Sequence, residues 1–201
     1  MKIVQKYSHS DGEVILHKIQ PGLFSEIEKI INSIGAASTK TKVSKIPGKL
    51  LYDPRSLSQA FNTAFFAQGW KESRYNYYLT LNRELMEKSL QLPAWLQKEF
   101  LMKNGEKDPV FRFNQMDYIR DKVAVEIQFG KHASVATDLF VKHVLFNTAG
   151  LTSVGIEILV TKAMQMEMSK GTAFYEGEVY NLLRQPAACP AVPLLLLGIE
   201  P

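Results

Sequence analysis

Residues 114–131 read NQMDYIRDKVAVEIQFGK and form the most informative stretch of the chain. From Val123 onward the apolar side chains alternate with others, which is typical of a strand because successive side chains point to opposite faces of a sheet. One predicted face is uniformly apolar and must be core; its members are Val123, Val125, Ile127 and Phe129. The opposite face carries Glu126 and Gln128 beside Ala124, and this polar pair needs an explanation of its own.

A tight turn at Asp121 and Lys122 would fold the stretch into a hairpin. Asp117 would then lie directly across from Glu126, with β-carbons about 5 Å apart. Asp-Lys is not among the favoured two-residue hairpin turns, so the sequence leaves the register open.

Two carboxylates that close repel each other unless a cation lies between them. Oxygen ligands with an amide neighbour such as Gln128 favour Mg²⁺, with Mn²⁺ as a substitute, over Zn²⁺. Such an ion polarises a phosphoryl oxygen and activates a water, which is the chemistry of phosphodiester hydrolysis. The alternative is a surface hairpin with one solvated acid on each strand, and the spacing of Asp117 and Glu126 alone does not decide between the two.

Composition sets broad limits on the class of protein. The 201 residues suffice for one core and are slightly short for two domains, so we expect a single domain over residues 1–201. A hydrophobic fraction of 46% and a charged fraction of 22% are ordinary for a globular protein. The net charge of +4 permits a nucleic-acid partner without requiring one.

The single cysteine, Cys189, excludes an internal disulfide framework and a multi-cysteine zinc site. No apolar run approaches the roughly 18 residues that cross a bilayer, and the first residues lack the apolar core of a secretory signal. We therefore expect a cytoplasmic protein without a membrane partner.

The remaining patterns predict an α/β fold with a mixed central β-sheet flanked by helices. Strands are expected at residues 2–7 and 13–19, joined as a hairpin by Asp11-Gly12, and at residues 154–160 and 192–199. Helices are expected at residues 23–34, 57–66, 83–103 (with a break at Pro93), 134–147, 162–170 and 176–184. The order strand, helix, strand over residues 123–160 predicts a crossover with parallel pairing.

Two further segments are rich in basic residues. Residues 38–49 carry Lys40, Lys42 and Lys45 with almost no apolar pattern, which fits either a solvated loop or a mobile basic arm that meets phosphates. In residues 70–78 Arg74 lies among tyrosines, a mixture that suits phosphate contact as well as packing.

Several stretches resemble type II restriction endonucleases of the BglII and BstYI group, most closely the latter. The central match is FNQMDYIRDKVAVEIQFGK followed by SVATDLFVKH. The stretches KIVQKYSH, LLYDPRSLSQAF, GWKESRYNYY, YEGEVYNLLRQ and PAVPLLLLGIEP match in the same order, so that the resemblance covers nearly the whole chain.

The resemblance implies a restriction-endonuclease-like core and a variant of the Asp, Glu-x-Lys active site in which Gln128 replaces the lysine. Asp117 and Glu126 would ligate Mg²⁺, and Gln128 would help to position the attacking water. A glutamine is neutral and cannot act as a strong base. Ser73 aligns with an auxiliary polar group of the group's active sites, with Glu72 as its substitute.

The resemblance also implies a homodimer that reads double-stranded DNA at a palindromic, GATC-centred hexanucleotide of the purine-GATC-pyrimidine type and leaves 5′ GATC overhangs. Lys131 falls where the group places a base-contacting residue, and a lysine can donate to guanine O6 and N7. A second recognition loop would comprise Ser169, Lys170 and Thr172 and touch the outer base pair.

The helix over residues 134–147 would lie at the dimer interface, and His132 and His143 are interpreted as phosphate-contacting or interface residues rather than metal ligands. Two alternatives stay open at this point. One is a non-cleaving DNA-binding protein of the same fold, and the other is an α/β protein whose acidic hairpin binds a small ligand or an ion.

Overall fold

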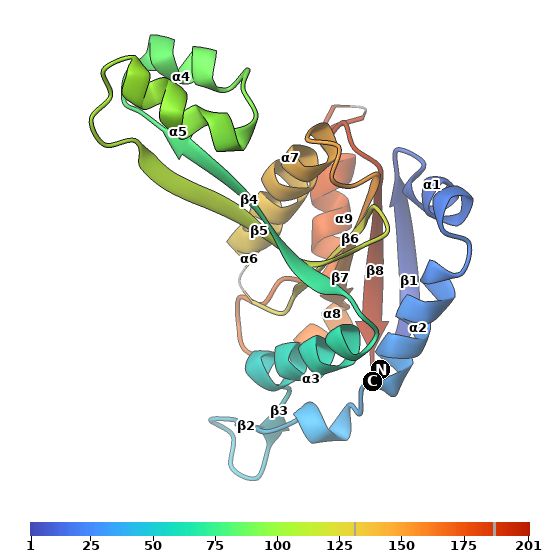
Figure 1. Cartoon of the computed structure of the whole chain (residues 1–201). Coiled ribbons are helices and arrows are strands. Elements are labelled where there is room, and N and C mark those ends of the chain that lie inside the picture. The colour runs from blue at the N-terminus through green and yellow to red at the C-terminus, as the bar shows by residue number, and fades with distance from the viewer. Residues whose placement is uncertain (131, 187) are drawn as a thin grey trace. The chain divides into compact units, whose positions relative to one another are not determined.

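The computed structural model describes residues 1–130, 132–186 and 188–201, and only the backbone at positions 132 and 133. The described residues divide into two compact units, one made of Met1–Glu72 and Asp117–Pro201 and the other of Ser73–Met116 (Figure 1). The single domain that the length of the chain indicates stays a prediction.

The main sheet of the described residues has six strands in the order β1-β8-β7-β6-β5-β4. Their bounds are β1 Lys2–His9, β4 Lys71–Leu79, β5 Val110–Arg120, β6 Val123–Gln128, β7 Val154–Val160 and β8 Leu194–Glu200. β6, β7 and β8 pair in parallel, whereas β1 pairs antiparallel with β8 and β5 antiparallel with β6. The prediction of an α/β fold with a mixed sheet is confirmed.

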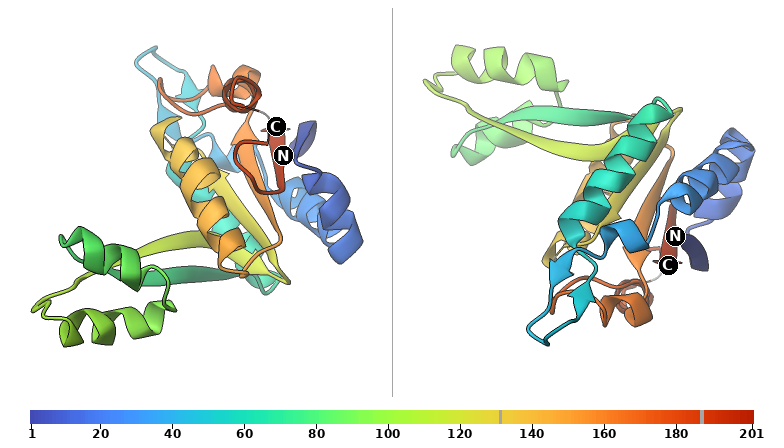
Figure 2. Two further views of the ribbon diagram at one scale, coloured as in Figure 1. Left: turned by 90° about the horizontal axis from the view of Figure 1, so that it is seen from above. Right: turned by 90° about the horizontal axis from the view of Figure 1, so that it is seen from below.

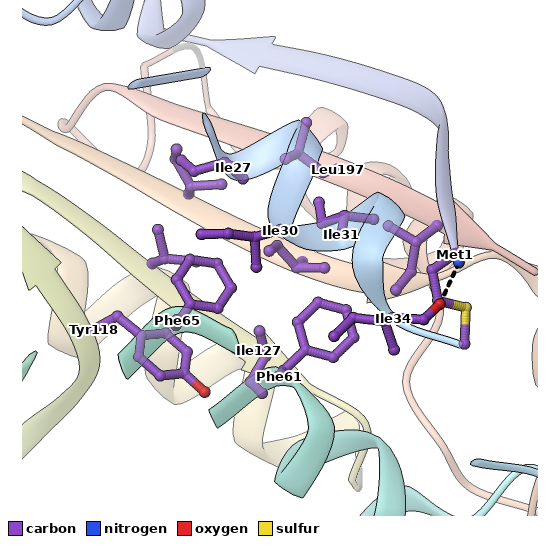
Figure 3. Close-up of a cluster of buried hydrophobic side chains, with 14 of the residues drawn as sticks. Met1, Ile27, Ile30, Ile31, Ile34, Phe61, Phe65, Tyr118, Ile127 and Leu197 are labelled. Atoms are coloured by element: carbon purple, nitrogen blue, oxygen red, sulfur yellow. Dashed lines mark hydrogen bonds between the residues drawn. The ribbon is translucent and has the colours of Figure 1, made fainter. Parts of the chain in front are cut away.

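Helices of the first unit cover both faces of the sheet (Figure 2). On one face lie α2 (Leu23–Ser33) and α3 (Pro54–Ala67), whose buried side chains join the predicted apolar face of β6 in one core cluster. Figure 3 shows this cluster around Phe61, Phe65 and Ile127, closed at one end by the amino group of Met1, which donates to the carbonyl of Ile34 at 2.7 Å. The predicted assignment of the apolar face of β6 to the core is therefore confirmed.

The other face is covered by a helical segment between β6 and β7 and by α9 (Tyr175–Leu183). This segment consists of α6 (His132–Thr137), a π-helical turn at Asp138–Lys142 and α7 (His143–Thr148). Val135 and Leu139 from it pack with Leu194 and Leu196 of β8. The predicted parallel crossover is confirmed, with a π turn that the sequence pattern did not indicate.

The predicted N-terminal hairpin is wrong in its second half. Residues 2–7 do form a strand, but the following segment is the helix α1 (Gly12–Ile19). The Asp-Gly turn signal corresponds to a sharp entry into this helix, with Ser10 and Asp11 at positive φ. β1 instead pairs along its length with β8 from the end of the chain, a long-range contact that overrides local β-propensity.

The other predicted helices are present with changed bounds: α3 and the segment between β6 and β7 are longer than predicted, and the rest are equal or shorter. The pattern at residues 162–170 yields only α8 (Lys162–Gln165). The expected basic arm, residues 38–49, overlaps a 3-10 turn at Ala37–Thr39 and includes β2 (Lys42–Val43), which forms a small hairpin with β3 (Leu50–Leu51) just after the arm. In the described part of the chain no helix has the length and apolar character needed to span a membrane.

The second unit contains most of β4 and β5 with two helices, α4 (Arg83–Ser89) and α5 (Ala94–Lys103), separated at Pro93 as predicted. Trp95, Phe111 and Phe113 are exposed large hydrophobic residues here, Trp95 most of all. Arg74 donates from Nε to Oε1 of Gln115 at 2.7 Å and stacks on the ring of Phe113.

Candidate active site

The β5–β6 hairpin turns at Asp121 and Lys122, as the sequence predicted. Both residues have positive φ, 50° and 67°, which gives the turn the twist that tight hairpins need. The pairs Arg120 with Val123 and Tyr118 with Val125 then follow in register. The uncommon Asp-Lys turn is thus compatible with the register that brings Asp117 to Glu126.

Next to these pairs, the backbone N–H groups of Asp117 and Ile127 donate to side-chain carboxylates instead of to backbone carbonyls. The backbone N–H of Asp117 donates to Oε1 of Glu126 at 3.2 Å. In return, the N–H of Ile127 donates to Oδ2 of Asp117 at 3.3 Å. Both carboxylates are held at the point where the two strands separate, and the predicted meeting of Asp117 and Glu126 is confirmed.

This site is not the solvated surface hairpin that the spacing alone allowed. Glu126 is only 2% exposed and Asp117 is half-buried, because the α6–α7 segment covers this face of β6. Burying a carboxylate is costly unless hydrogen bonds or opposite charge compensate it. The site therefore needs positive charge.

One source of that charge is Lys142 in the π-helical turn, which the sequence reasoning placed only within a helix. Its ammonium Nζ lies 2.9 Å from Oε2 of Glu126 and 2.6 Å from Oδ1 of Asp138. Asp138 in turn accepts from Nε2 of Gln128 at 3.1 Å. Since Asp138 and Lys142 are four residues apart, their spacing looks in sequence like an ordinary surface ion pair.

The pKa values show that Lys142 does not fully compensate the acids. Burial raises the pKa of Glu126 to about 9, with the neighbouring Asp117 carboxylate as the next cause. Burial also raises the pKa of Asp117, although the charge of Lys142 opposes it. Burial by itself would lower the pKa of Lys142, but Glu126 and Asp138 outweigh it and raise that pKa. The site still favours an additional cation.

A divalent ion fits these residues. Asp117 and Glu126 offer hard oxygen ligands, and when both are ionised they carry, together with Asp138, more negative charge than the ammonium of Lys142 balances. Within the described ranges of the chain no group of three or more Asp, Glu, His or Cys side chains could by itself enclose a metal. An ion such as Mg²⁺ is commonly bound by one or two carboxylates, with water and substrate phosphate as its other ligands.

A second buried pair lies next to the site, and the sequence reasoning missed half of it. Glu157 of β7 is the ladder partner of Glu126 and is fully buried, with Oε2 3.4 Å from Nε2 of His143. Burial, followed by the charge of Lys142, lowers the pKa of His143 to about 3. The interpretation of His143 as a phosphate or interface contact is wrong, because the side chain is only 1% exposed.

The residues predicted to contact DNA are placed as follows. Lys40 forms an ion pair with Glu167, Lys42 donates to Oγ of Ser169 at 2.6 Å, and Lys45 is exposed. Lys170 is exposed, whereas Thr172 is buried and donates from Oγ1 to the carbonyl of Ser169 at 3.0 Å. The structure thus joins the basic arm to the predicted recognition loop, which the sequence did not indicate.

For four other candidates the structure gives little or no information on side-chain contacts. Lys131 lies outside the described residues, as does the side chain of His132. Ser73 is half-buried and is the first residue of the second unit. Glu72, its possible substitute, is exposed and is the last residue before that unit. The roles of Lys131, Ser73 and Glu72 stay predictions.

The raised pKa of Glu126 predicts a pH dependence of stability without metal. In the unfolded chain this carboxyl ionises near 4.5, and in the folded protein near 9, so the free energy of unfolding falls as the pH rises between these values. Below 6.5 the neutral, buried His143 acts in the opposite direction. From pH 6.5 to 9 we expect Glu126 by itself to contribute a loss of about 1 kcal/mol per pH unit, in addition to the loss from the buried Glu157, whose pKa is also raised by burial.

Urea unfolding in EDTA across this window measures the effect. Glu126→Gln removes the titrating group without changing its shape, so its slope should be clearly shallower than that of the wild type. Equal slopes for the two proteins would contradict the assignment of this pH dependence to Glu126.

Comparison with known proteins bears on this arrangement. The family model described as restriction endonuclease BglII/BglIII matches residues 4–199. Among solved structures, restriction endonuclease BglII complexed with a DNA 16-mer is similar over 100% of this chain and 79% of its own, with 20% identity and a TM-score of 0.63. Free BglII is similar over 100% and 80%, with 20% identity and a TM-score of 0.58. Among curated protein sequences none matches this chain.

Proposed function

Because the chain belongs to the BglII/BglIII family of restriction endonucleases, and is therefore a type II site-specific deoxyribonuclease, we propose that it cuts double-stranded DNA at a palindromic, GATC-centred hexanucleotide with Mg²⁺ as cofactor. The site would be of the purine-GATC-pyrimidine type, as in BstYI-like enzymes, and cleavage would leave 5′ GATC overhangs. Mn²⁺ would substitute for Mg²⁺, and the enzyme would act in the cytoplasm.

The observation that carries this proposal is the meeting of Asp117 and Glu126 where β5 and β6 separate. Their carboxylates are fixed by backbone N–H groups, and both pKa values are raised in a site that lacks sufficient positive charge. Such an arrangement is costly for a merely structural hairpin. It is useful to an enzyme that must hold a divalent ion beside a phosphate.

In this proposal Asp117 and Glu126 hold the ion, which when bound supplies Lewis-acid polarisation of the phosphate and activation of water for attack. The residues around it orient the reacting groups. Gln128 cannot take a proton as a strong base, and both ends of its amide are engaged, with Oε1 accepting from the N–H of Gly130 at 2.9 Å. Any help it gives to the attacking water would use its remaining hydrogen-bonding capacity. Ser73 would be an auxiliary polar group.

Recognition of the DNA would use two kinds of contact. Lys131 would read a base of the GATC core, and the loop of Ser169, Lys170 and Thr172 would face the outer pair. Lys40, Lys42, Lys45 and Arg74 would contact phosphates and supply the salt-sensitive part of the affinity. A palindromic site matches a two-fold homodimer in which each subunit cuts one strand.

The experiment that tests this function is digestion of plasmid DNA by the purified protein with Mg²⁺, followed by sequencing of the ends. We expect defined fragments whose ends all derive from purine-GATC-pyrimidine sites. Binding of such sites without cleavage in Mg²⁺ or Mn²⁺ would instead support a non-cleaving DNA-binding protein of this fold.

A further inference from the structure

The active-site strand of this protein lacks a cation at the position where the common Asp, Glu-x-Lys pattern has one. Gln128 stands there, two residues after Glu126, and an amide carries no charge. Phosphodiester cleavage concentrates negative charge on the phosphate, and fixed positive groups stabilise that charge. The question is which side chain of this chain takes over the role.

Lys142 is the ammonium group that reaches the site in the described part of the chain. Its Nζ contacts Oε2 of Glu126, the oxygen of that carboxylate which does not accept from the Asp117 backbone. Glu126 is therefore held from two sides, by a backbone N–H and by an ammonium. The side chain of Lys142 is only 18% exposed, so its charge is directed into the site rather than into solvent.

The support of Lys142 leads back to Gln128. Asp138 accepts from Lys142 with Oδ1 and from Gln128 with Oδ2. Gln128, Asp138, Lys142 and Glu126 thus form one continuous chain of contacts. The amide that replaces the lysine on β6 contacts the aspartate that holds a lysine on the neighbouring helix.

The local backbone gives a second, independent indication. Asp138–Lys142 is a π-helical turn, in which the N–H of His143 donates to the carbonyl of Asp138. Such turns are rare, cost regular hydrogen bonding and occur frequently at functional sites. A buried ion pair is also weak as a source of stability, because desolvation offsets most of its attraction. The segment is better explained by function than by stability alone.

We propose that Lys142 is a positioning residue of the active site. From the α6–α7 segment it supplies the positive charge that the common Asp, Glu-x-Lys pattern places on the strand. Asp138 and Gln128 hold the ammonium of Lys142 against Glu126. This inference rests on the proposed nuclease function. It assigns Gln128 a supporting role toward Lys142, in addition to any contact with water.

The test removes the positive charge at position 142 and then restores a positive charge at position 128. Lys142→Met keeps the length of the side chain and removes the charge, and cleavage should fall about 100-fold, the order expected for loss of one fixed stabilising group. Gln128→Lys in the Lys142→Met background returns an ammonium next to Asp138 and should recover cleavage by about 10-fold, a typical coupling between neighbouring residues. Lys103→Met, which breaks an exposed pair with Glu99 of the same spacing, is the matched control and should cleave normally.

A second readout separates this role from loss of structure. Mn²⁺ binding without DNA should become tighter in Lys142→Met, by roughly 10-fold, because a positive charge next to the ion is removed. Gln128→Lys in that background should return the affinity toward the wild-type value. A residue needed only for folding would lower the affinity for Mn²⁺ and the melting temperature together.

The outcomes are distinguishable. Cleavage by Lys142→Met equal to that of the Lys103→Met control would overturn the inference, as would joint loss of cleavage, Mn²⁺ affinity and melting temperature without recovery in the double variant. If the wild type does not cleave DNA at all, the proposed function fails. In that case Mn²⁺ affinity alone decides the inference, and an unchanged affinity in Lys142→Met overturns it.

Discussion

Glu126→Gln should lose DNA cleavage by roughly 10,000-fold, the order of loss found when one member of a catalytic unit is removed. The amide keeps the shape of the side chain but cannot offer a second anionic oxygen to a divalent ion beside Asp117. Because burial and Asp117 raise the pKa of Glu126 to about 9, the metal-free wild type already carries this side chain largely in its neutral form at pH 7. The variant should therefore fold normally and bind its DNA site at least as tightly as the wild type.

Single-turnover cleavage of a labelled duplex and gel-shift titration in EDTA measure the two effects. Glu87→Gln makes the same chemical change in an exposed pair with Arg83 and should leave both unchanged. Cleavage by Glu126→Gln within the range of this control would exclude Glu126 from the metal site. Parallel loss of binding and cleavage would make its role one of DNA affinity.

Gly12→Ala should produce the largest loss of stability among the substitutions considered, about 3 kcal/mol. A β-carbon at this position would lie 2.2 Å from the carbonyl oxygen of Leu194. That backbone cannot move cheaply, because Leu194 is paired with His9 of β1 on one side and with Gly155 of β7 on the other. The start of α1 would have to leave the sheet.

The control for this prediction is Gly22→Ala at the start of α2. Gly22 has φ −87°, and a β-carbon there meets nothing within 4 Å. This change should leave the free energy of unfolding unchanged or raise it by about 0.5 kcal/mol, because alanine lowers the conformational entropy of the unfolded chain. Urea unfolding at pH 7 compares the two variants, and similar stabilities for both would show that α1 does not lie so close to β8.

The sequence predicted the part of the site that depends on local geometry. Alternation along β6 identified which side chains of that strand face the core, and the two-residue turn at Asp121 fixed which residues oppose each other. A one-residue slip would have put Glu126 into the apolar core, which disfavours other registers, although the uncommon Asp-Lys turn did not by itself specify one. The resemblance to restriction endonucleases supplied the expected chemistry.

Contacts between distant elements could not be predicted in the same way. Lys142 and Asp138 resemble an exposed helical pair until the helix is packed on β6, and Glu157 is one acid within an apolar strand. The register of β6 with β7, which places Glu157 beside Glu126, depends on the crossover. The helix α1 was missed because β1 found its partner at the opposite end of the chain.

We propose that the carboxylates of Asp117 and Glu126 serve a metal-dependent, sequence-specific DNA endonuclease. Digestion of plasmid DNA with Mg²⁺ and sequencing of every end tests it most directly. We expect cuts after the first base of purine-GATC-pyrimidine sites, with 5′ GATC overhangs and no cutting in EDTA. Absent or smeared cleavage in both Mg²⁺ and Mn²⁺ would contradict it.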